Sequence, residues 1–185
     1  MENYTTLPQM GFVEACKKAC RDIVVFKGRS RRSEYWWTFL ALVIVTCVAT
    51  ILSYFGTAGE ILNNILTIIV AIIGISALFR RLHDTGHSGW YEGASIILGL
   101  AGVTLIACGI FSGSMSLEEL TADPVSATSS LADSMTSSGM GMIVAGSVVL
   151  TAQVILNIVI LVFTLMDSDP EPNKYGDSPK YQIVD

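Results

Sequence analysis

Histidine, aspartate and arginine side chains, the types used in acid–base chemistry and metal binding, gather in the stretch RRLHDTGH, residues 80–87. His83 stands beside Asp84, and His87 follows four residues later, a spacing that would place two ligands on one helix face. Gly86 interrupts this spacing because glycine breaks a helix, and no third ligand is assured. We therefore predict no metal, no cofactor and no enzymatic activity for this cluster.

The arginines of the same region favour a different chemistry, the binding of phosphate groups. Ser88 is a good N-cap for a helix starting at Trp90, so free N–H groups and the positive end of the helix dipole would face an anion beside the arginines. At a membrane surface the available anions are lipid phosphates. The predicted site for anionic phospholipid comprises Arg29, Arg31, Arg32, Arg80, Arg81, His83, Ser88 and Trp90.

The composition is that of a membrane protein. Of the 185 residues, 51% are hydrophobic and only 15% are charged, which is too apolar for an ordinary soluble domain. The net charge of −5 argues against nucleic acid as a partner. Membrane lipids are therefore the predicted surroundings.

Four apolar runs predict an all-α integral membrane protein with four transmembrane helices. Each run is long enough to cross the roughly 30 Å of a bilayer's hydrocarbon core at about 1.5 Å per residue. A soluble four-helix bundle would need polar outer faces, yet a stretch such as ILTIIVAIIGISALF is apolar on every side. The predicted spans are 36–55, 61–79, 90–111 and 142–166.

The distribution of positive charge predicts the orientation of these spans. Seven of the eleven Lys and Arg residues precede the first span, two lie between the second and third, and two follow the fourth. An even number of spans places these three regions on one side, which the positive-inside rule assigns to the cytoplasm. The predicted organisation is a cytoplasmic segment 1–35, a transmembrane domain 36–166 with an outer loop 112–139, and a cytoplasmic tail 167–185.

The segment before the first span has the pattern of an amphipathic helix. Charged residues fall on other faces than the apolar ones, which predicts an interfacial helix on the inner leaflet. A helix that caps the protein in water is the alternative. The apolar residues at helical spacing are Phe12, Val13, Cys16, Ala19, Cys20, Ile23 and Val24.

Three blocks of the sequence resemble the DUF805 family of small bacterial inner-membrane proteins. They are FKGRSRRSEYWW before the first span, FRRLHDTGHSGWY between the second and third, and NKYGDSP after the last. The resemblance covers nearly the whole chain apart from the Ser-rich outer loop. It implies a four-helix protein of the bacterial inner membrane, and the family has no established biochemical activity.

The derived topology places all three blocks at one interface. We therefore predict a polar layer in which Glu34, Asp84, Asn173 and Tyr175 pair with the arginines, because charges left unpaired near the bilayer are costly. This layer could hold the helices together or bind a ligand. Both interpretations remain open from the sequence.

Two polar residues inside the fourth span, Gln153 and Asn157, lie one turn apart. Such groups occur in transport pathways and in contacts between helices. A small-solute transporter or channel acting as an oligomer is therefore the alternative function. The spacing of Ser95 and Gly99 also predicts close helix packing, within the chain or in a homo-oligomer.

Overall fold

The computed structural model describes the backbone of residues 3–120 and 139–184. The chain forms two compact units, Met1–Glu92 with Ile160–Asp185, and Gly93–Val159. Within the described residues, four helices are long and apolar enough to cross a membrane, which confirms the predicted four-span helical architecture. They are α2 (Arg32–Ser53), α3 (Thr57–Asp84), α4 (Trp90–Leu120) and α6 (Met140–Leu165).

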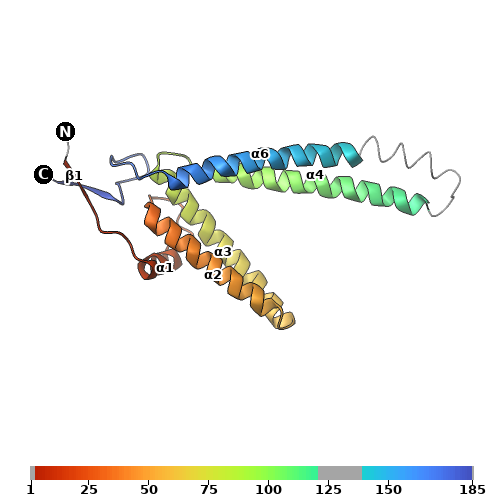
Figure 1. Cartoon of the computed structure of the whole chain (residues 1–185), viewed down its shortest axis with the longest axis horizontal. Helices are drawn as coiled ribbons and strands as arrows, with labels where there is room; N and C mark the ends of the chain where they lie inside the picture. The colour runs from red at the N-terminus through yellow and green to blue at the C-terminus, as the bar shows by residue number, and fades with distance from the viewer. Residues whose placement is uncertain (1–2, 121–138, 185) are drawn as a thin grey trace. The chain divides into compact units, whose positions relative to one another are not determined.

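Helices α2 and α3 lie side by side as a hairpin (Figure 1). Gly56 forms the turn with φ +100°, a conformation that residues with a Cβ atom rarely adopt. Ala49 and Ala77 are buried, whereas many large apolar side chains of both helices are exposed, as expected of helices that face lipid. Helix α3 continues beyond the predicted end of its span at Phe79 to Asp84, so the charged block RRLHD belongs to the helix.

Helices α4 and α6 also lie side by side (Figure 1). The helix α4 extends past Phe111 to Leu120, so the predicted outer loop 112–139 begins later than expected. The extension contains Met, Leu and Glu, which are good helix formers even though they end the apolar run. Residues 121–138 of the predicted loop lie outside the described residues.

Small residues allow α4 and α6 to approach closely. A Cβ atom added to Gly146 would lie 2.8 Å from the carbonyl oxygen of Gly102, and one added to Gly99 would lie 2.6 Å from Nε2 of Gln153. The hydroxyl of Ser95 donates a hydrogen bond of 2.6 Å to Oδ1 of Asn157. The small-residue packing expected from the sequence therefore occurs within one chain, and the polar residues of the fourth span take part in it.

The N-terminal helix α1 (Phe12–Arg21) packs against α2. Ala15 and Ala19 are its buried residues, and their small side chains permit this close contact. The helix ends at Arg21, so Ile23 and Val24 of the predicted apolar stripe lie beyond it. The stripe is thus divided between a side that packs on the protein and a side that is exposed.

A two-stranded antiparallel sheet joins the ends of the chain, a feature that the prediction of an all-α fold missed. Strand β1 (Asn3–Thr6) pairs with β2 (Tyr181–Val184), and Asn3 is opposite Val184 (Figure 1). Tyr4 pairs with Ile183 and Tyr181 with Thr6, and the two tyrosine rings lie diagonally across the ladder with centroids 6.4 Å apart. The tail predicted as 167–185 is therefore a folded part of the protein.

The close contact between α4 and α6 predicts that a larger side chain on α6 destabilises the protein at some positions and not at others. Gly146→Leu should lower the free energy of unfolding by about 1–3 kcal/mol, because the side chain would collide with the backbone of α4. Gly141→Leu is the matched control, since nothing lies within 4 Å of a Cβ atom at that position. Denaturant unfolding in detergent micelles measures both, and equal midpoints would contradict the close packing.

Candidate functional site: a buried layer of arginines and carboxylates

The last turn of α3 positions the charged residues of the block RRLHD. Gly86 has φ +75°, His87 N–H donates to the Leu82 carbonyl at 2.9 Å, and Gly86 N–H donates to the His83 carbonyl at 3.2 Å. These two bonds form a Schellman motif, which ends a helix at a left-handed glycine. Asp84 is consequently the last residue of α3 and lies directly before the turn.

Asp84 is the centre of a cluster, here called the Asp84 cluster, formed with Arg29, Arg81 and Ser168. The Asp84 carboxylate is fully buried and accepts hydrogen bonds from Arg29 Nε at 3.0 Å, from Arg81 Nη1 at 2.5 Å and from Ser168 Oγ at 2.5 Å. Both arginine side chains are at most 1% exposed. One carboxylate thus connects α3, the segment before α2 and the tail.

Backbone carbonyl groups complete the coordination of the two arginines. Arg81 donates to the carbonyls of Thr164 and Met166 at the end of α6, where the helix dipole is negative. Arg29 donates to the carbonyls of Asp169 at 2.6 Å and Glu171 at 2.8 Å in the tail. These oxygen atoms offset the second positive charge, which Asp84 alone leaves uncompensated.

A second group, the Glu34 cluster, fixes α1 to the hairpin. Glu34 is 3% exposed and accepts a hydrogen bond of 2.8 Å from Lys18 of α1. Arg80 Nη1 lies 3.6 Å from Glu34 Oε1 and 3.2 Å from Asp22 Oδ2. Charges from α1, α2 and α3 therefore neutralise one another at one place.

The NKYG block folds back onto the end of α3. Asn173 Nδ2 donates to the His83 carbonyl at 3.0 Å, and the Tyr175 ring stacks on the His83 ring with centroids 3.7 Å apart. His83 Nδ1 lies 3.2 Å from the carbonyl oxygen of Gly28, so this histidine contacts all three sequence blocks. His87 instead stacks on Phe163, and the two histidines have different partners.

The residues predicted to bind anionic lipid separate into two groups. Arg29, Arg80 and Arg81 are buried and donate to protein acceptors. Arg32 is exposed, and Trp90 is 74% exposed. Ser88 acts as expected of a helix cap, because its hydroxyl accepts from Trp90 N–H at 3.3 Å. Arg31 is buried and donates to the Pro8 carbonyl at 2.5 Å.

Sequence reasoning missed three members of these clusters, Lys18, Asp22 and Ser168. Lys18 lies on the charged side of the predicted amphipathic helix, and Asp22 follows that helix without any motif. Ser168 lies in the stretch DSDPEPNKYG, five residues before the start of the block NKYGDSP. Their partners are distant in sequence, so no local spacing indicated the contacts.

A family model now identifies the chain. The model of DUF805, described as a protein of unknown function, matches residues 23–177. The chain belongs to the DUF805 family. The matched region begins after α1 and includes all residues of the Asp84 cluster, so this layer lies within the part that defines DUF805.

Two curated relatives of this DUF805 chain are also membrane proteins. The inner membrane protein YhaH of Escherichia coli strain K12 is 39% identical over 79 residues, which are 40% of this chain and 65% of the relative. YhaH of Escherichia coli O157:H7 matches to the same extent. No solved structure matches the chain. With its four apolar helices, the chain is a multi-pass inner-membrane protein of a family of unknown function.

The Asp84 cluster predicts a large difference between two Asp→Asn substitutions in this DUF805 protein. Asp84→Asn should lower the free energy of unfolding by about 3–5 kcal/mol, because two buried arginines would lose their carboxylate. Asp167→Asn should lower it by at most about 1 kcal/mol, because its pair with Lys180 is solvent-exposed.

Unfolding in detergent micelles, followed by circular dichroism, measures both variants at neutral pH. The Lys180 hydrogen bond lowers the pKa of the Asp167 carboxyl, so Asp167 is ionised there and the control removes a real charge. Equal losses in the two variants would show that the Asp84 carboxylate has no special importance for the fold.

Proposed function

We propose that this protein is a non-catalytic module of the inner membrane whose cytoplasmic face is held rigid by the Asp84 and Glu34 clusters and engages anionic phospholipid. The clusters use protein acceptors for their arginines, which supports a structural role for them. Lipid contact then falls to the basic and apolar side chains that the clusters leave exposed. The observation that supports this proposal is the set of side chains exposed on α1 and on the segment after it.

Apolar and basic side chains alternate on that exposed surface. Val13, Val24, Val25 and Phe26 are exposed by 62%, 67%, 41% and 40%. Lys17, Arg21 and Lys27 are exposed beside them. A helix with this mixture lies well in a lipid headgroup region, where apolar groups enter the acyl boundary and cations meet phosphates.

A cytoplasmic location of both termini is part of the proposal. The pairing of β1 with β2 supports placing both ends on one side, and the positive-inside rule selects the cytoplasm because the basic residues flank that side. Phe12 packs edge-on against Trp37 with centroids 5.8 Å apart, which supports placing α1 at headgroup level beside the start of α2.

Transport by an oligomer and enzymatic activity have less support. Gln153 lies against Gly99, and Asn157 accepts a hydrogen bond from Ser95, so both polar groups serve contacts between α4 and α6. His83 is engaged by Gly28 and Tyr175. Homo-oligomerisation stays a prediction.

The lipid preference can be measured in nanodiscs. We expect a higher unfolding midpoint in phosphatidylglycerol than in phosphatidylcholine of the same acyl chains, and a smaller difference at high salt. Lys17→Gln with Lys27→Gln should reduce the preference, since each cation near an anionic surface contributes about 1 kcal/mol. Equal midpoints of the wild type in both lipids would refute the engagement of anionic lipid.

The orientation can be tested with the exposed thiol of Cys20 as the only cysteine. With Cys16→Ser, Cys47→Ala and Cys108→Ala in place, a membrane-impermeant maleimide should label inverted inner-membrane vesicles and leave intact spheroplasts unlabelled. Labelling of intact spheroplasts would instead place the N-terminus outside.

A further inference from the structure

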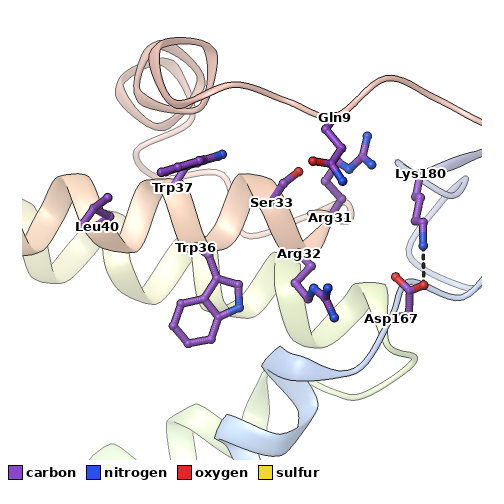
Figure 2. Close-up of a pocket in the computed structure, with 9 residues that line it drawn as sticks. All are labelled: Gln9, Arg31, Arg32, Ser33, Trp36, Trp37, Leu40, Asp167 and Lys180. Atoms are coloured by element: carbon purple, nitrogen blue, oxygen red, sulfur yellow. Dashed lines mark hydrogen bonds and ion pairs between the residues drawn. The ribbon is translucent and has the colours of Figure 1, made fainter.

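A cavity of about 370 Å³ lies at the start of α2, beside the N-terminal segment and the tail (Figure 2). Its volume is within the range of small-ligand sites in proteins. Gln9 comes from the segment before α1, and Asp167 and Lys180 come from the tail. The remaining lining residues belong to the first three turns of α2 or directly precede it.

The lining changes from polar to apolar along α2. Ser33, Trp36, Trp37 and Leu40 have the spacing i, i+3, i+4 and i+7, which places them on one helix face. The polar end is at the start of the helix, where the charged clusters lie. The apolar end lies along the transmembrane part of α2. An acyl chain extends from a lipid headgroup in the same direction, into the membrane.

The polar end offers several unused groups to an anion. Ser33 Oγ is buried and has no hydrogen-bond partner within the described residues. A buried hydroxyl without a partner costs free energy. No described side chain caps the N-terminus of α2, so its first N–H groups and the positive end of its dipole are available. Ser33 lies in the first turn of α2, and the cap position is Arg31.

The residues that line the polar end of the cavity have a net positive charge. Arg31 and Arg32 both line the cavity, and their backbone acceptors, the Pro8 and Leu165 carbonyls, are uncharged. Lys180 is paired with Asp167, so these two residues offset each other. The cavity therefore carries an excess of two positive charges near the start of α2.

We propose that this cavity binds the phosphate of one anionic glycerophospholipid. The phosphate meets Arg32, the Ser33 hydroxyl and the N-terminus of α2, while the glycerol and the start of an acyl chain lie along Trp36, Trp37 and Leu40. The inference deepens the proposed function and rests on it, because it assigns one retained lipid to one site in addition to the general attraction of α1 for an anionic surface.

Retention of single lipids, measured by native mass spectrometry from mixed micelles, tests the site. We expect one phosphatidylglycerol to remain bound in preference to phosphatidylcholine. Arg32→Gln should weaken this binding about tenfold, because a charge-assisted hydrogen bond is lost. Lys174→Gln is the matched control, since it removes an exposed cation of the tail outside the cavity and should leave the affinity unchanged.

Ser33→Ala separates ligand binding from a purely structural role. The affinity for phosphatidylglycerol should fall about three- to tenfold with the loss of one hydrogen bond. The unfolding midpoint in phosphatidylcholine should stay equal or rise, because the variant removes a buried hydroxyl without a partner. A purely structural serine would change both quantities in the same direction.

The outcomes distinguish the site from the general proposal. If Arg32→Gln and Lys174→Gln bind phosphatidylglycerol equally, the cavity is not the site, although the lipid preference in nanodiscs can still hold. If the nanodisc preference is also absent, the proposed function fails with it. If inorganic phosphate titrated into neutral micelles stabilises the wild type but not Arg32→Gln, and no lipid is retained, a soluble phosphate is the ligand and the lipid assignment is overturned.

Discussion

The buried carboxylate of Asp84 is the constraint on which the membrane-boundary part of this protein depends. It receives Arg29, Arg81 and Ser168 from three separate parts of the chain, in a place without access to water. Removing such groups from water costs several kcal/mol per ion, and this cost is offset only where every donor and acceptor is matched. The carboxylate therefore selects one arrangement of its neighbours, since any other would leave a buried charge unpaired. Its contribution is to the specificity of the fold more than to its net stability.

The backbone of the tail is as important to this arrangement as the charged side chains. Two arginines and one aspartate leave an excess positive charge, and the carbonyl groups at the end of α6 and in the tail lie where that charge is. The tail must therefore follow one path, which the stacking of Tyr175 on His83 and the pairing of β2 with β1 also maintain. Chain ends that resemble flexible extensions thus form a folded layer at the ends of the helices.

The four helices could be predicted from the sequence because hydropathy and segment length are local properties of the chain. The apolar runs predicted the four spans to within a few residues, and the extension of α3 to Asp84 was missed only because its last turn is charged. The three blocks that resemble DUF805 indicated a shared polar layer. The partners within that layer were not predictable, because Lys18 meets Glu34 only through the packing of α1 on α2, and Ser168 meets Asp84 only through the course of the tail. For the same reason, the sequence did not separate the buried arginines from the exposed Arg32.

The rigid layer also explains how a lipid site could exist in so small a protein. The cavity is lined from three parts of the chain, and each is fixed independently of any ligand. Arg31 is tied to the backbone near Pro8, Ser33 belongs to the first turn of α2, and Lys180 precedes β2. A site held in advance loses little freedom when its ligand binds. By linkage, a lipid that binds only this arrangement must stabilise the layer that forms it, so loosening the Asp84 cluster would weaken lipid retention without a change to any residue that touches the lipid.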